Sequence, residues 1–362
     1  MAVELEDNRL PLKALTRLVR DLQQPRAGIY WTDLIGCVIA AGFGVYLSMP
    51  FPDAIVHGSP VAIGGFVLAV LALYRASYFN HELSHHARQL PGFEVGWNVL
   101  IGVPLLIPSF LYSDHRNHHS VRGFGTGDDV EYFTPGMRGF KGAAALLAAC
   151  FVLPFIYVAR FSVLLTVAWV SPAVRRWVDV RASSLGILGL SRRATPTLAE
   201  RRVWRIQEFA CFAYLLVSGI LLLTGVVPPM NVVHIYAVIV ALLVLHGIRI
   251  MVGHRYESDG KPRDRVDQVL DSFNFTARVP TTILAPLGFN LHALHHLFPH
   301  IPYHNMPEAH RRVSAALPKD SLYHSVAAPS YFGEVVRFLL RRDADAVRAS
   351  AHGAQGGQVS AP

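Results

Sequence analysis

Long, uninterrupted apolar runs dominate the chain and predict membrane-spanning helices. Four of these runs are close to 20 residues long, and they cover residues 29–51, 60–79, 206–228 and 232–251. An α-helix rises 1.5 Å per residue, so about 20 residues cross a hydrocarbon layer about 30 Å thick. Short connectors join the runs in pairs, so we expect two helical hairpins.

Two further apolar stretches contain residues that are unsuited to the interior of a membrane helix. The stretch 96–112 holds two prolines, and the stretch 142–170 holds Pro154 and Arg160. If either stretch crossed the membrane once, the polar segments on its two sides would lie in different compartments. We therefore interpret both as re-entrant or interfacial. The predicted fold is an all-α integral membrane protein, with about four transmembrane helices in two hairpins, interfacial helices and a polar cap.

The distribution of arginine predicts how the chain is oriented. The connectors 52–59 and 229–231 carry no Lys or Arg, whereas residues 172–205 carry eight arginines. Because basic loops stay in the cytoplasm, we expect the connectors outside and both termini and the polar cap inside. The first residues mix acidic and basic side chains, unlike a signal peptide.

We divide the chain into three parts on this pattern. Residues 1–28 form a cytoplasmic N-terminal segment, residues 29–313 form the membrane domain, and residues 314–362 form a cytoplasmic tail. The end of the tail is rich in Gly, Ala, Ser and Gln, a composition typical of disorder.

Composition agrees with a membrane protein and argues against a soluble domain, a nucleic-acid-binding protein and cysteine-based sites. The chain is 52% hydrophobic and only 16% charged, whereas soluble domains are about a quarter charged. The net charge of +8 lies in blocks beside the apolar runs, which argues against a nucleic-acid partner. All three cysteines lie in apolar segments, so neither a disulfide framework nor a cysteine metal site is expected.

Half of the 18 histidines fall into three short clusters that carry the candidate chemistry. The clusters read HELSHH from residue 81, HRNHH from residue 115 and HALHH from residue 292. Residues at i, i+3 and i+4 share one face of a helix, so each cluster can direct two or three imidazoles at one point. Imidazole binds zinc, copper, iron and nickel, and the clusters exceed the needs of one ion. They therefore predict two metals.

The three clusters resemble the histidine boxes of the membrane fatty acid desaturase and hydroxylase superfamily. The run 288–313 is similar to the third-box region of bacterial desaturases, and 126–132 resembles the acidic stretch that often follows the second box. The resemblance covers about residues 29–313. It implies a non-haem di-iron centre on the cytoplasmic face, with O₂ as co-substrate and two iron ions as cofactor.

The resemblance also implies a set of ligands. The box positions correspond to His81, His85, His115, His118, His119, His292, His295 and His296. A further ligand is expected between the fourth span and the third box, for which His254 is the best match and His246 the second choice.

Other polar side chains beside the boxes are candidates for orienting the imidazoles through their second ring nitrogen. They are His86, Glu82, Asp114, Asp128, Asp129, Glu131 and His304.

Within the superfamily we favour desaturation of a fatty acyl chain at the cytoplasmic face of a bacterial plasma membrane, because of the third-box run. Hydroxylation of a lipid or a carotenoid is the alternative. The chain has no haem-binding His-Pro-Gly-Gly motif, flavin fingerprint or ferredoxin cysteines. A separate electron donor of the ferredoxin, rubredoxin or cytochrome b5 type is therefore expected.

Two other classes compete with this interpretation. Residues 81–85 read HELSH, which also matches the HExxH signature of zinc proteases. A protease would leave the second and third clusters unexplained. A metal transporter would also use histidines, but its sites lie near the bilayer midplane rather than in polar flanks.

Overall fold

The computed structural model describes residues 9–49, 59–133, 137–185, 193–276 and 279–341, and it is almost entirely helical. The helices before the second hairpin are α1 Leu12–Leu18, α2 Ala27–Ser48, α3 Pro60–Ser77, α4 Phe79–His86, α5 Phe93–Trp97, α6 His115–His118, α7 Gly139–Ala159, α8 Leu165–Val170 and α9 Pro172–Arg181. The remaining helices are α10 Leu198–Leu223, α11 Pro229–Met251, α12 Arg265–Leu270, α13 Val279–Leu284, α14 His292–Leu297, α15 Met306–Ala316 and α16 Tyr331–Leu340. Two short parallel strands, β1 Asn274–Phe275 and β2 Ala327–Ala328, complete the set.

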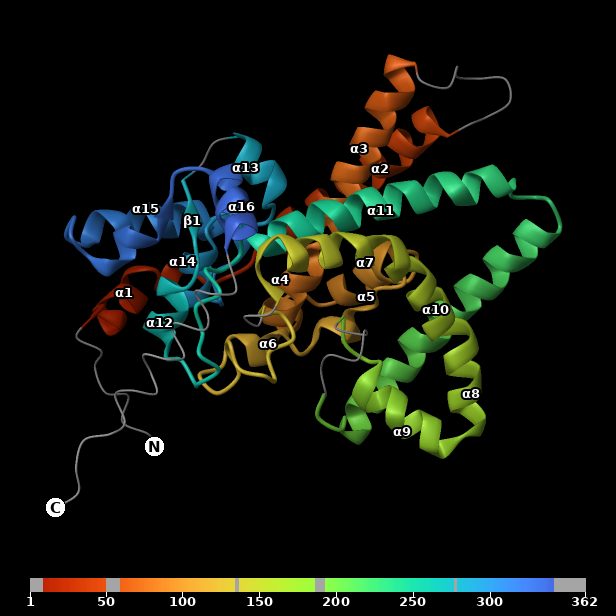
Figure 1. Cartoon of the computed structure of the whole chain (residues 1–362), viewed down its shortest axis with the longest axis horizontal. Helices are drawn as coiled ribbons and strands as arrows, with labels where there is room; N and C mark the ends of the chain where they lie inside the picture. The colour runs from red at the N-terminus through yellow and green to blue at the C-terminus, as the bar shows by residue number, and fades with distance from the viewer. Residues whose placement is uncertain (1–8, 50–58, 134–136, 186–192, 277–278, 342–362) are drawn as a thin grey trace.

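Two helical hairpins extend from the rest of the molecule, which confirms the predicted fold class. Helices α2 and α3 project side by side, and α10 and α11 meet at their far ends (Figure 1). Close packing within the first hairpin depends on glycine, because a Cβ atom on Gly44 would lie 2.6 Å from the carbonyl oxygen of Gly65.

Among the described residues, five helical segments are long and apolar enough to cross a membrane, rather than about four. The additional one covers Gly139–Val170 and joins α7 to α8 through a π-helical turn, η6, at Arg160–Leu164. Our expectation that Pro154 and Arg160 interrupt this stretch was wrong for the helix itself. Arg160 is tolerated because its guanidinium donates to Glu208 on α10 at 2.5 Å and to the carbonyl of Ala182. The placement of the stretch Gly139–Val170 at the membrane surface stays a prediction.

The stretch 96–112 forms only short helical turns, η3 at Asn98–Gly102 and η4 at Ser109–Tyr112. It is not among the five candidate spans.

A polar cap gathers at the end of the molecule opposite the hairpin tips. Helices α1, α12, α14 and α15 lie there, around a core that includes Leu15, Val266, Leu294 and Val313 (Figure 1). The N-terminal segment is fastened to the cap, since Arg312 on α15 donates to Asp21 at 2.7 Å. The last 21 residues, including the end of the predicted disordered tail, lie outside the described residues.

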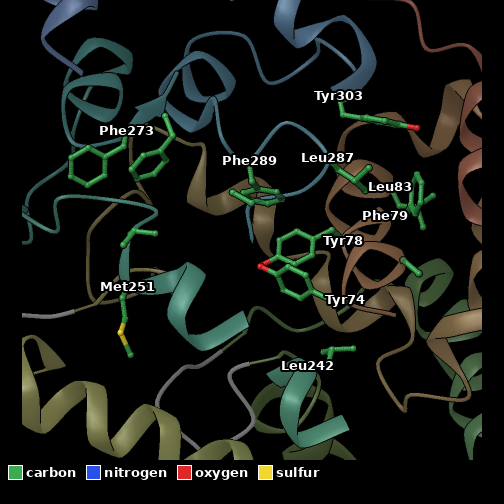
Figure 2. Close-up of a cluster of buried hydrophobic side chains, with 14 of the residues drawn as sticks. Tyr74, Tyr78, Phe79, Leu83, Leu242, Met251, Phe273, Leu287, Phe289 and Tyr303 are labelled. Atoms are coloured by element: carbon green, nitrogen blue, oxygen red, sulfur yellow. The ribbon is translucent and has the colours of Figure 1, made fainter. Parts of the chain in front are cut away.

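An aromatic core connects the membrane helices to this cap. Tyr74 lies on α3, and Tyr78 follows the last residue of that helix. The ring of Tyr78 faces Phe289, which lies just before α14, and the two ring centroids are 4.8 Å apart (Figure 2). This packing brings the third histidine cluster against the end of the second membrane helix.

Candidate metal centre

Four segments bring the histidines together. Helix α4 follows α3 after a single residue, so the first cluster continues the second membrane helix. The second cluster forms the one-turn helix α6, the third forms α14, and His254 lies three residues after the end of α11. Tertiary packing therefore joins residues that are far apart in the chain, such as His81 and His295, which are 214 positions apart.

The nine predicted histidines form two groups. The first group contains His81, His85, His115, His119 and His295, and the second contains His118, His254, His292 and His296. Within each group, one ring nitrogen per residue lies within 4.8 Å of all the others. The structure thus divides the adjacent residues His118 and His119 between two centres.

The facing nitrogens are close enough to share one ion. In the first group the Nε2 atom of His295 lies 3.0 Å from Nε2 of both His81 and His119. In the second group the Nε2 atom of His254 lies 3.1 Å from Nε2 of both His118 and His292. Two ligands at right angles, each about 2.1 Å from a metal, are about 3.0 Å apart. The spacing therefore fits two metal ions.

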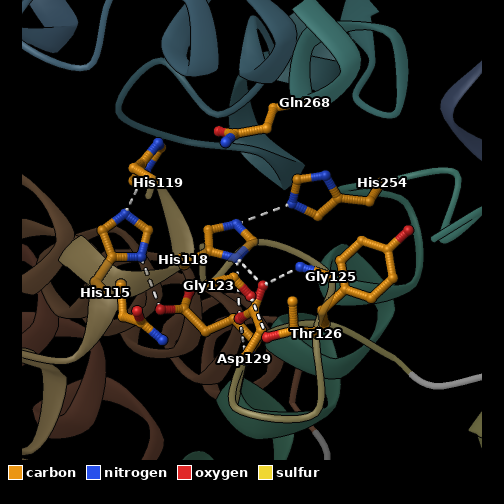
Figure 3. A network of polar contacts seen from close by, with 12 residues as sticks. His115, His118, His119, Gly123, Gly125, Thr126, Asp129, His254 and Gln268 are labelled. Carbon is orange, nitrogen blue, oxygen red and sulfur yellow. Dashed lines mark hydrogen bonds and ion pairs between the residues drawn. The ribbon is translucent and has the colours of Figure 1, made fainter. Parts of the chain in front are cut away.

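Two carboxylates fix the tautomers of box-two histidines (Figure 3). Asp129 accepts a hydrogen bond from Nδ1 of His118 at 2.8 Å, and Glu131 accepts one from Nδ1 of His115 at 2.7 Å. Because the proton then resides on Nδ1, the lone pair on Nε2 points into the group, as metal binding requires.

The electrostatic environment keeps most of these imidazoles neutral. Burial lowers the pKa well below its ordinary value for His119, His254, His292, His295 and His296. For His118, burial also acts to lower the pKa, but the carboxylate of Asp129 raises it overall. Burial alone would raise the pKa of Glu131, yet the neighbouring His115 brings it to about 2. Metal binding needs neutral imidazoles, and the ionised carboxylate of Glu131 can accept the Nδ1 proton of His115.

Two supporting residues were not identified from the sequence. The hydroxyl of Ser272 lies 3.0 Å from Nδ1 of His254, and the side-chain oxygen of Gln268 lies 3.4 Å from Nδ1 of His296. Both residues belong to the segment around α12, which carries no histidine. Only the fold shows that this segment covers the second group.

The sequence profile described as fatty acid desaturase matches residues 57–327, which include every histidine of both groups. The chain belongs to the fatty acid desaturase family. A ceramide hydroxylase from Caulobacter vibrioides (strain NA1000 / CB15N) is 35% identical to it over 360 residues, covering 97% of this chain and all of that protein. No solved structure matches the chain. The comparisons place the protein in the membrane desaturase and hydroxylase superfamily, which contains both desaturases and hydroxylases.

Most of the other side chains that we considered for orienting the imidazoles make no hydrogen bond to a histidine of either group. His86 faces Gln89, His304 accepts from the backbone N–H of Arg26, and Asp114 pairs with Arg193. The side chain of Asp128 is exposed. Among the described residues, only Asp129 and Glu131 of the seven candidates hydrogen-bond to a histidine of either group.

The structure also separates the alternative ligand His246 and the zinc protease interpretation from the proposed site. His246 lies outside both groups, with Nδ1 at 2.9 Å from the hydroxyl of Tyr78. Glu82 is 3.8 Å from Nδ1 of His81, but its hydrogen bonds come from the hydroxyl of Tyr30 and the backbone N–H of Tyr303. A zinc protease needs this glutamate free to act as a base. The geometry does not favour that reading.

Proposed function

We propose that this protein is an oxygen-dependent di-iron hydroxylase of a membrane lipid, with a ceramide as the substrate class. The observation that carries the proposal is the ceramide hydroxylase that aligns over 97% of the chain, together with the two histidine groups. Desaturation is the second candidate, since the family profile and the third-box run support it. Both outcomes begin with removal of hydrogen from an unactivated carbon.

The proposed reaction balances only with an external reductant. One C–H bond becomes C–OH, the second oxygen atom leaves as water, and two electrons and two protons are consumed. A separate carrier of the ferredoxin, rubredoxin or cytochrome b5 type would supply the electrons. Two bound irons would supply the activation of dioxygen that side chains cannot provide.

The residues of this chain position the reaction. The nine histidines would hold the metals, while Asp129 and Glu131 keep the ring nitrogens correctly oriented. The aromatic core around Phe289 lies directly against His81, with ring centroids 4.3 Å apart, and excludes water from that side. We place this site and both termini on the cytoplasmic side, as the arginine distribution predicts.

Expression in a host with simple lipids, with and without added ceramide, tests the proposal. Mass spectrometry should find one new oxygen atom in the lipid, and it should carry the label when ¹⁸O₂ is supplied. A new double bond without an oxygen atom would establish the desaturase alternative.

Variants of one histidine from each group test the metal requirement. The purified protein should hold close to two irons, and both His295→Ala and His118→Ala should lose metal and activity together. His324→Ala, outside both groups, is the control. Full activity with zinc alone would contradict the proposal.

A further inference from the structure

One buried arginine near the metal groups has no carboxylate partner among the described residues. Among the described residues three arginines are buried: Arg160, Arg175 and Arg249. Arg160 and Arg175 each donate to Glu208, at 2.5 and 2.8 Å. Arg249, near the end of α11, is only 9% exposed, and no described carboxylate pairs with it. Its Nη2 atom is buried without a hydrogen-bond partner among the described residues.

The surroundings of Arg249 leave the N–H groups of Nη2 available. The guanidinium lies over the ring of Phe289, with 3.6 Å between Cζ and the ring centroid, and 5.7 Å from that of Tyr78. A cation–π contact offsets part of the cost of burial but accepts no hydrogen bond. A buried guanidinium without an acceptor is costly. Unlike Arg160, which Glu208 neutralises, Arg249 is therefore a candidate for a functional site in a membrane helix. The observation therefore points to an acceptor that arrives from outside the chain.

The position of Arg249 connects that acceptor to the metal groups. The ring of Phe289 beneath the guanidinium is 4.3 Å from His81 of the first group and stacks 5.4 Å from His292 of the second. One aromatic ring thus separates the cation from ligand candidates of both centres. His246 lies one helical turn before Arg249 on α11, and its Nδ1 atom is 2.9 Å from the hydroxyl of Tyr78. Polar groups therefore lie within this part of the apolar core.

We propose that Arg249 binds the carbonyl oxygen of the linkage that joins the acyl chain of the lipid substrate to its headgroup. The inference rests on the proposed function, because it assumes that a lipid is the substrate. A carbonyl held there would bring the first few carbons beside the linkage to the metal groups and keep the distal chain away. Arg249 is then a specificity-determining residue that places oxidation close to the headgroup.

A binding measurement separates this inference from the reaction itself. The probes are a fluorescent N-acyl sphinganine and its thioamide analogue, which stays neutral and replaces the carbonyl oxygen with sulfur, a weaker hydrogen-bond acceptor. Wild-type protein in detergent should bind the amide lipid about 10- to 100-fold more tightly than the analogue, the range of a charge-assisted hydrogen bond. Equal binding of the two lipids overturns the inference, whether or not the protein oxidises either of them.

Variants of Arg249 sharpen the result. Arg249→Gln should bind the amide lipid about as weakly as the wild type binds the analogue, while metal content stays near that of the wild type. Arg249→Lys should recover part of the difference. Arg337→Gln, at an exposed arginine on α16, is the matched control. A folded Arg249→Gln variant that binds the amide lipid as tightly as the wild type would refute the inference. If this variant fails to fold, the comparison of the two lipids on wild-type protein decides.

The position of the new oxygen provides an independent readout. We expect it within the first few carbons of the linkage in wild-type product, and spread along the chain in Arg249→Lys product. Oxidation confined to the middle of the chain in the wild type would overturn the inference. An absence of any oxidised lipid would instead count against the proposed function, and the binding comparison would still stand.

Discussion

At the residue scale, the neighbours Asp128 and Asp129 have the same chemistry but opposite surroundings. Asp129 is buried, and besides Nδ1 of His118 it accepts from the backbone N–H groups of Gly125 and Glu131. The side chain of Asp128 is exposed, and its backbone carbonyl accepts from Asn117.

We expect Asp129→Asn to weaken metal binding in the second group by about 10- to 100-fold, because an amide no longer fixes the proton on Nδ1 of His118. Asp128→Asn should bind metal like the wild type. Metal titration of both purified variants measures the difference. Equal affinities would show that Asp129 only braces the loop.

Residue spacing could predict which histidines are metal ligands, but not how they divide between the two groups. The i, i+3 and i+4 pattern selects His115, His118 and His119 as neighbours on one helical turn. It does not show that His118 faces His254 while His119 faces His295, because that depends on how the fold places α6 relative to α14 and to the residues after α11. Ser272 and Gln268 carried no pattern at all. Their roles come from tertiary packing alone.

At the element scale, a buried ion network holds the segment Gly139–Val170 against α10. Glu208 accepts from both Arg160 in the π-helical turn and Arg175 on α9, and Arg175 also donates to Asp179. Hydrophobic runs of suitable length could be read from the sequence. The continuity of this helix could not, because the residue that neutralises Arg160 lies 48 positions away.

We expect Glu208→Gln to lower the free energy of unfolding by about 3–5 kcal/mol, because it leaves two buried guanidinium groups with one carboxylate. Asp259→Asn, which removes an exposed carboxylate beside Lys261, should have little effect. Unfolding of the purified protein in mixed micelles measures both. A Glu208→Gln protein as stable as the wild type would mean that the network contributes specificity rather than stability.

At the scale of the whole molecule, the arginine distribution predicts that the metal groups and both termini share the cytoplasmic side. We expect single cysteines at Arg122→Cys and Ser191→Cys to react with an impermeant reagent only from the cytoplasm. His57→Cys and Asn231→Cys should react only from outside. Positions 57 and 191 lie outside the described residues. Labelling of position 191 from outside would show that Gly139–Val170 crosses the membrane once.

The two histidine groups also join separate parts of the molecule, which gives metal removal a local signature. Lone pairs of neutral imidazoles that face one another at 3.0–3.1 Å repel each other unless a cation lies between them. Metal binding to such groups is coupled to folding, so chelation should loosen α4, α6 and α14. Packing of α2 against α3 through Gly44 and Gly65 is independent of the metals.

We therefore expect a chelator to increase hydrogen exchange at the backbone amides of α4, α6 and α14, and to leave the α2–α3 hairpin protected. Added Fe²⁺ should restore the protection of α4, α6 and α14, because each ion again adds a connection between these segments. The exchange rates of α2 serve as the internal control. Unchanged exchange in α4, α6 and α14 after the metal has been removed would mean that packing alone holds the histidines, and that metal binding is not coupled to folding.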